Sequence, residues 1–254
     1  MHTQNSIKLI SLNIERDQHY ETALPFLKAE QADVICLQEL LDRDVERFKE
    51  ELGMDGLYAP TGVADRGRNT EALAAAGVCM GTGLFSRLPL SEARVLYYHG
   101  TPEKVPSSMD PVSSGWHENF NGILLAGTIE HKGASVTVGT THFTWTPDGS
   151  VSEGQRQDIQ VFLEKMREFP DIVFCGDFNA PRGGEIWGEL ASRYKDNIPV
   201  EYRTSIDPNL HIVKDLPHLV DGLFSSPKYL VSDVRLVEGV SDHKAVVGFI
   251  ERIN

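Results

Sequence analysis

One stretch of the chain decides the fold: DIVFCGDFN, residues 171–179. Residues 171–175 form a short, mostly apolar run, which predicts a β-strand covered on both faces. The carboxylate of Asp177 and the amide of Asn179 follow directly after Gly176. The stretch therefore predicts a buried strand that delivers two polar groups at its end.

The same arrangement recurs along the chain, because other predicted strands also begin or end on a carboxylate, an amide or an imidazole. These groups are Asn13 at the end of residues 7–14, Gln38 and Glu39 after residues 34–37, His142 after residues 136–141, Asp221 within residues 219–224, and Asp242 and His243 before residues 245–250. A single case is typical of a solvated turn residue. Several strand ends of this kind predict one polar cluster at one edge of the fold, where ligand sites tend to be built.

The side chains of this cluster indicate metal-assisted phosphoester chemistry. Carboxylate and amide oxygens suit Mg²⁺, Mn²⁺ or Ca²⁺, and the cluster contains no cysteine. Two histidines with carboxylates nearby suit acid–base work and the stabilisation of a charged phosphorane. The sequence has no GxxxxGK[ST], GxGxxG or GxSxG motif, which argues against a P-loop nucleotidase, a Rossmann oxidoreductase and a serine hydrolase.

The order of the predicted elements indicates an α/β fold. Helices are predicted over residues 20–31, 44–52 and 152–169, and further strands over residues 83–85, 94–98, 123–130 and 230–237. Early βαβ units, a central hairpin and late strands predict mixed sheets packed face to face with helices outside, in a single domain over residues 1–254. The polar stretches 60–76 and 99–119 are predicted to be loops or lids.

The composition is that of an ordinary globular protein and excludes several other classes. Apolar residues make up 41% and charged residues 24%, unlike a disordered, collagen-like or disulfide-rich chain. The formal net charge of −13 at pH 7 provides no general field for holding duplex DNA. The sequence shows no membrane span or secretory signal, and its three widely spaced cysteines fit reduced core residues, so a cytoplasmic location is expected.

The polar motifs occur in an order that resembles the endonuclease/exonuclease/phosphatase superfamily. They are SLNI (11–14), LQE (37–39), THF (141–143), GDFNA (176–180), VDGLF (220–224) and SDH (241–243). This superfamily includes pancreatic deoxyribonuclease, the neutral sphingomyelinases and the inositol polyphosphate 5-phosphatases. The resemblance implies a four-layered αββα sandwich of two mixed sheets flanked by helices, with Mg²⁺- or Mn²⁺-dependent cleavage of phosphoester bonds.

By the same resemblance, three residues would form the metal side of the site. Glu39 would be the main metal carboxylate, with Asn13 nearby and Asp242 as a further carboxylate. The chain departs from the family at Glu15, where many members carry Asp or Asn two residues after the first Asn.

The resemblance implies catalytic roles for five other residues. Asp177 would orient or deprotonate the attacking water, and Asn179 would hold a phosphate oxygen. His243 would contact the scissile phosphate, with Asp221 as its buried carboxylate partner. His142 matches the histidine of the branch whose strand ends in Thr-His, which places the chain nearer the deoxyribonuclease, sphingomyelinase and tyrosyl phosphodiesterase members.

Three functions stay open at this stage. The first is hydrolysis of a small or flexible phosphoester, such as a nucleotide, a sugar phosphate or a lipid head group. The second is a DNA nuclease or an enzyme that processes DNA ends, and the third is a non-catalytic binding module of the same fold. Arg66 and Arg68 form either a solvated loop or a clamp for substrate phosphate, and Trp145 is expected to line the pocket. The sequence does not indicate an oligomeric state.

Overall fold

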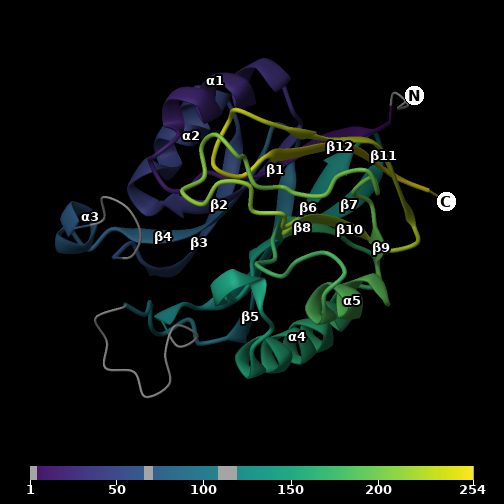
Figure 1. Ribbon diagram of the computed structural model, residues 1–254. Coiled ribbons are helices and arrows are strands. Elements are labelled where there is room, and N and C mark those ends of the chain that lie inside the picture. The colour runs from purple at the N-terminus through teal and green to yellow at the C-terminus, as the bar shows by residue number, and fades with distance from the viewer. Residues whose placement is uncertain (1–4, 66–70, 108–118, 254) are drawn as a thin grey trace.

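The computed structural model describes residues 5–65, 71–107 and 119–253 of the protein. The strands in these ranges form two six-stranded sheets (Figure 1). The first sheet has the order β11-β12-β1-β2-β4-β3. Its strands are β1 (Ile7–Asn13), β2 (Val34–Leu41), β3 (Asp55–Val63), β4 (Cys79–Ser86), β11 (Tyr229–Val237) and β12 (Ala245–Arg252). The second sheet has the order β5-β6-β7-β8-β10-β9. Its strands are β5 (Leu90–His99), β6 (Gly122–His131), β7 (Ala134–His142), β8 (Val173–Asp177), β9 (Lys195–Asp196) and β10 (Asp221–Ser225).

Each sheet combines one parallel strand pair with antiparallel neighbours, which confirms the prediction of mixed sheets. The parallel pairs are β1 with β2 and β7 with β8. A helix connects each pair, as parallel pairing requires: α1 (Tyr20–Glu30) in the first sheet and α4 (Glu153–Lys165) in the second. Side-chain oxygen Oγ of Ser152 caps α4 by accepting a hydrogen bond from the backbone N–H of Gln155 at 3.1 Å.

Helices cover the outer face of each sheet and complete the four predicted layers (Figure 1). Leu27 of α1 and Phe48 of α2 (Val45–Leu52) pack in one apolar cluster with Ile10 of β1. On the other side, Phe162 of α4 and Trp187 of α5 (Glu185–Ala191) pack in the cluster that contains Phe174, Phe224 and the residues between the sheets. Cys36 and Cys175 are buried in this second cluster, as predicted, whereas Cys79 is only half-buried.

Three parts of the predicted secondary structure need correction. Residues 60–76 were expected to be a loop, but Pro60 to Val63 belong to β3 and a short helix, α3 (Glu71–Ala75), follows. β3 lies at the edge of its sheet and pairs with one strand only. An edge strand tolerates Pro60, which has no backbone N–H, because one of its sides has no neighbouring strand to bond to. The helix α5 was not predicted, and Trp187 within it is buried. In the second polar stretch, His99 is the last residue of β5, and residues 108–118 lie outside the described residues.

Strand register brings the polar strand ends together. Asn13 lies opposite Gln38 in the first sheet, and His142 and Asp221 both lie opposite Asp177 in the second. Between the sheets, Nε2 of Gln38 donates a hydrogen bond to Oγ1 of Thr140 at 3.0 Å. The two sheets are therefore joined by polar contacts at the end of the sandwich where the site residues gather.

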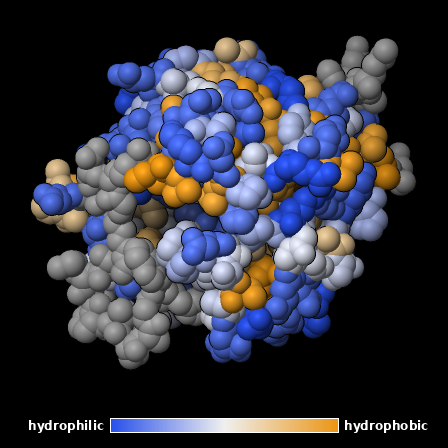
Figure 2. Space-filling model, viewed as in Figure 1, coloured by the Kyte–Doolittle hydropathy of each residue, from blue (hydrophilic) through white to orange (hydrophobic). Residues whose placement is uncertain are grey.

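The visible surface in Figure 2 is mostly hydrophilic, with apolar patches that are separate from one another. Within the described ranges, no helix is both long and apolar enough to cross a membrane.

Candidate active site

The carboxylate of Asp177 is the centre of the candidate site. Its side chain is almost completely buried at the end of β8. Oδ2 accepts a hydrogen bond from Nδ2 of Asn13 at 3.1 Å, and it lies 3.6 Å from Nε2 of His142 and 3.8 Å from Nε2 of His243. Oδ1 accepts a hydrogen bond from the backbone N–H of Asn179 at 2.8 Å. One carboxylate thus joins predicted site residues from both sheets.

A buried pair, His243 and Asp221, faces this carboxylate. Nδ1 of His243 lies 2.7 Å from Oδ2 of Asp221, and Ser205 holds the strand of Asp221 because its Oγ accepts a hydrogen bond from the Asp221 backbone N–H at 3.0 Å. Burial by itself lowers the pKa of His243, but the negative charges of Asp221 and Asp177 outweigh burial and hold that pKa well above its usual value. The ring is therefore positively charged at neutral pH, with Nε2 directed toward Asp177.

Glu39 lies on the first sheet, beside Asn13. Its backbone has a positive φ of 58°, at the irregularity in the pairing of β2 with β4 between Leu37 and Leu40. Nδ2 of Asn13 donates to Oε1 of Glu39 at 3.3 Å, and Nη1 of Arg16 donates to Oε2 at 3.2 Å. The structure therefore places the predicted metal residues Asn13 and Glu39 together and adds a buried arginine to them.

Asp242 contributes a further buried carboxylate on the same side. Burial raises its pKa, and the negative charges of Glu15 and Glu39 raise it further. Three carboxylates, Glu15, Glu39 and Asp242, thus share this region with the guanidinium of Arg16, which pairs with two of them at 3.2 and 3.5 Å. A site with several carboxylate oxygens and an excess of negative charge fits a hard divalent cation.

Asn179 and His142 complete the set of predicted residues. Nδ2 of Asn179 donates to the backbone carbonyl of Phe143 at 2.8 Å, which fixes the amide and leaves its second N–H for another acceptor. His142 ends β7 with a half-buried side chain that faces Asp177. All eight predicted residues thus lie around the ends of β1, β2, β7, β8, β10 and the segment before β12.

Sequence reasoning missed four residues near the site. Arg16 and His19 lie in the turn after β1, and nothing in their local pattern separates them from surface residues. Asp207 is fully buried and accepts hydrogen bonds from the backbone N–H groups of Asn209, Leu210 and Gly239 at 2.7–3.2 Å. The Asp-Pro-Asn sequence at 207–209 is a turn signal that could have indicated this loop. The same loop carries His211, whose ring centre lies 6.5 Å from that of His243.

Three other predicted positions are not settled by this geometry. Arg66 and Arg68 lie outside the described residues, so the phosphate clamp stays a prediction. The side chain of Trp145 is 47% exposed, and its place in the pocket lining also stays a prediction.

Three solved structures share this fold along nearly their whole length. The catalytic domain of human Nocturnin with bound sulfate has a TM-score of 0.71 at 19% identity and covers 98% of this chain and 94% of its own. A mannosyl-6-phosphatase from Bacteroides thetaiotaomicron has a TM-score of 0.67 at 17% identity, with 96% and 99% coverage. TDP2 from D. rerio, humanized by 14 mutations, has a TM-score of 0.67 at 17% identity, with 98% and 100% coverage.

Sequence comparison gives the family directly. No curated protein matches the chain. A family model, described as Endonuclease/Exonuclease/phosphatase family, matches residues 10–243, a range that includes each of the predicted site residues. With the fold and the gathered strand ends, this match shows that the chain belongs to the endonuclease/exonuclease/phosphatase family.

Proposed function

We propose that the protein is an Mg²⁺- or Mn²⁺-dependent hydrolase of phosphoester bonds in a small or flexible phosphorylated substrate. Members of its family are hydrolases that act on phosphoester bonds. The observation that carries the proposal is the contact of one buried carboxylate, Asp177, with an amide and two imidazoles from β1, β7 and the segment before β12. Such a group can orient a water molecule and bind a phosphate oxygen at the same place.

Asp177 would act on the attacking water, and the two histidines would bind the phosphate. Asp177 would orient or deprotonate the attacking water. His243, charged and held by Asp221, would donate a hydrogen bond from Nε2 to an oxygen of the scissile phosphate, where negative charge develops. His142 would position the phosphate from the neighbouring strand, and the second N–H of Asn179 would bind another phosphate oxygen.

The carboxylates on the first sheet would hold the cation. Glu39 would be the main ligand, with Asn13 beside it and Asp242 from the segment before β12. When bound, a divalent cation would neutralise part of the phosphate charge and polarise the phosphoester. Arg16 would keep Glu39 oriented, because its Nη1 already pairs with one oxygen of that carboxylate.

The negative net charge of the chain favours a small substrate over a long DNA duplex. The chain has a formal net charge of −13, and tight duplex binding usually depends on several Lys or Arg contacts with the DNA phosphates. One of the similar structures is named as a sugar phosphatase, and another, TDP2, represents the alternative of a DNA-end enzyme. We therefore place sugar phosphates and nucleotides before DNA as candidate substrates.

A substrate panel tests the proposal. The full chain would be assayed with Mg²⁺ or Mn²⁺ against hexose phosphates, nucleotides, inositol phosphates, sphingomyelin, and single- and double-stranded DNA, with Asp177→Asn as the inactive control. We expect turnover of at least one small phosphoester that is lost in Asp177→Asn. Rapid plasmid nicking with micromolar duplex affinity would favour a nuclease, and no turnover of any phosphoester with either cation would overturn the proposal.

A further inference from the structure

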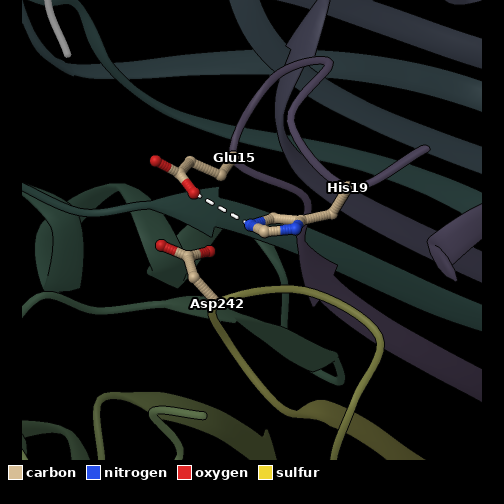
Figure 3. Close-up of side chains that lie close together, drawn as sticks. All are labelled: Glu15, His19 and Asp242. Atoms are coloured by element: carbon tan, nitrogen blue, oxygen red, sulfur yellow. Dashed lines mark hydrogen bonds and ion pairs between the residues drawn. The ribbon is translucent and has the colours of Figure 1, made fainter. Parts of the chain in front are cut away.

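Glu15, His19 and Asp242 converge beside the predicted metal carboxylate Glu39 (Figure 3). Each offers one ligand atom, and these three atoms all lie within 4.8 Å of one another. Figure 3 shows the carboxylates of Glu15 and Asp242 directed toward the imidazole of His19. We call these three residues the histidine group. Its nitrogen donor distinguishes it from the oxygen-only ligand set of Asn13, Glu39 and Asp242.

Backbone contacts hold the histidine group in place from two segments. The backbone N–H of Glu15 donates to Oδ1 of Asn13 at 3.1 Å, and residues 15 and 16 both adopt positive φ, of 43° and 60°, which turns the chain sharply after β1. Oγ1 of Thr22 donates to the backbone carbonyl of Val240 at 2.8 Å. Because Thr22 lies in the first turn of α1 and Val240 just before Asp242, this bond fixes His19 relative to Asp242.

Charge at Asp242 points to a cation in this group. Asp242 is only 7% exposed, and the one side-chain hydrogen bond it makes among the described residues comes from Oγ of Ser241 at 3.1 Å. In the same part of the chain it forms no ion pair with Lys, Arg or His, because Arg16 is directed at Glu15 and Glu39. The imidazoles of His243 and His211 offset part of the charge of Asp242, but the carboxylates of Glu15 and Glu39 lie nearby, so the region keeps an excess of negative charge.

Distances within the group fit metal ligation. Nε2 of His19 lies 3.0 Å from Oε2 of Glu15. Two metal–ligand bonds of about 2.1 Å that meet at about 90° place their ligand atoms about 3.0 Å apart. An ion pair between His19 and Glu15 has the same distance, but it would give Glu15, which already pairs with Arg16, a second positive partner and would leave Asp242 without an ion pair. A divalent cation between all three residues compensates both carboxylates.

We propose that Nε2 of His19, with the carboxylates of Glu15 and Asp242, binds a divalent transition metal such as Mn²⁺, Co²⁺ or Zn²⁺ in preference to Mg²⁺. Imidazole nitrogen is a favourable ligand for transition metals, whereas Mg²⁺ takes oxygen ligands and keeps its waters. The inference rests on the proposed function in one respect, because Asp242 is also a residue of the proposed catalytic cation site. It extends that proposal by assigning a metal preference to His19, a residue outside the motifs of the family.

Metal titration of the full chain tests the inference without any substrate. The affinities of Co²⁺, Zn²⁺ and Mg²⁺ would be measured by calorimetry and, for Co²⁺, by its visible absorption, in the wild type, in His19→Gln and in His99→Gln. His99 is a matched control for His19, because its ring is also half-buried beside a carboxylate. That carboxylate belongs to Asp158, which is not part of the histidine group. We expect the wild type to bind Co²⁺ and Zn²⁺ at least about tenfold more tightly than Mg²⁺.

The variants separate the nitrogen ligand from the rest of the site. His19→Gln should lose about tenfold or more in affinity for Co²⁺ and Zn²⁺, keep its Mg²⁺ affinity within about threefold, and change the Co²⁺ spectrum, whereas His99→Gln should match the wild type. A His19→Gln protein with wild-type Co²⁺ and Zn²⁺ affinity would overturn the inference.

A second measurement uses only the wild-type protein and does not depend on the folding of a variant. In wild-type protein labelled with ¹⁵N at histidine, Zn²⁺ should shift the ring nitrogens of His19 and Mg²⁺ should not. Unshifted His19 nitrogens at saturating Zn²⁺ would also overturn the inference. Failure of the substrate panel would leave these metal measurements unaffected, and failure of the metal measurements would leave Mg²⁺-dependent turnover possible, so the two proposals fail separately.

Discussion

Replacing Gly176 by alanine tests whether the close approach of β7 and β8 holds the site together. Gly176 has a φ of +142°, and a Cβ at this position would lie 1.9 Å from the carbonyl oxygen of Thr141 on β7. An ordinary contact of about 3.5 Å would require the two strands to separate by about 1.5 Å. Because His142 and Asp177 are the next residues of the same two strands, the separation would also pull these two side chains apart.

The expected destabilisation follows from these two effects. A backbone conformation that side chains rarely adopt costs about 1–3 kcal/mol, and overpacking costs about 1–3 kcal/mol more. A loss of about 2–6 kcal/mol in the free energy of unfolding should lower Tm by at least about 4 °C in a chain of this length. Differential scanning calorimetry and urea unfolding of Gly176→Ala would measure both quantities.

Gly188→Ala is the matched control. Gly188 lies inside α5, and a Cβ there would meet no atom within 4 Å outside its own helix and chain neighbours. Because alanine is the better helix former by about 1 kcal/mol, this variant should keep or slightly raise Tm. A Gly176→Ala protein that melts within about 2 °C of wild type would refute the reasoning about strand approach.

Removal of divalent cations with EDTA should abolish phosphoester turnover, and Mg²⁺ or Mn²⁺ should restore it; full activity in excess chelator would contradict the metal role of Glu39. Asp177→Asn and His243→Ala should each lower kcat by about 10² or more, and a variant within about threefold of wild type would show that the assigned role is wrong. The raised pKa of His243 keeps its ring charged at neutral pH, and the charge is lost as pH rises through that pKa. Asp221→Asn removes the nearest anion and should therefore move the alkaline loss of activity to lower pH, which a pH–rate profile would measure. Duplex DNA should bind weakly at about 150 mM salt, because the acidic chain offers few phosphate contacts, and fluorescence anisotropy would detect a micromolar complex if one formed.

Local patterns were sufficient to predict most of the fold. An apolar run that ends on a polar residue identifies a buried strand and its end, because both features lie within a few consecutive residues. Residues 171–179 illustrate this, since the predicted strand and the structure's β8 overlap and Asp177 stands at the end of β8. The strand ends meet in space because parallel pairs such as β7 and β8 place His142 opposite Asp177.

The remaining features depend on contacts that sequence patterns do not encode. β3 contains Pro60 and two glycines, and it is a strand because β4 pairs with it along one side. Arg16 has the sequence context of a surface residue, and its burial follows from the positive φ values of residues 15 and 16. His19 approaches Asp242 because β1 pairs with β12 and because Thr22 of α1 bonds to Val240, more than 200 residues later in the chain.

The candidate site divides into two halves that differ in the ligands they can bind. Near the end of β8, the charged imidazole of His243, from the segment before β12, lies beside Asp221 and Asp177, with His142 nearby, so this half can donate hydrogen bonds to a phosphate oxygen. Near the ends of β1 and β2, the carboxylates outnumber Arg16, and burial, with the negative charges of Glu15 and Glu39, raises the pKa of Asp242, so this half attracts a cation. Phosphate bound between the halves would satisfy the first, and a divalent cation would satisfy the second. Substitutions in one half should therefore alter phosphate binding and those in the other should alter metal binding, with Asn13 as the link, because its Nδ2 donates to both Asp177 and Glu39.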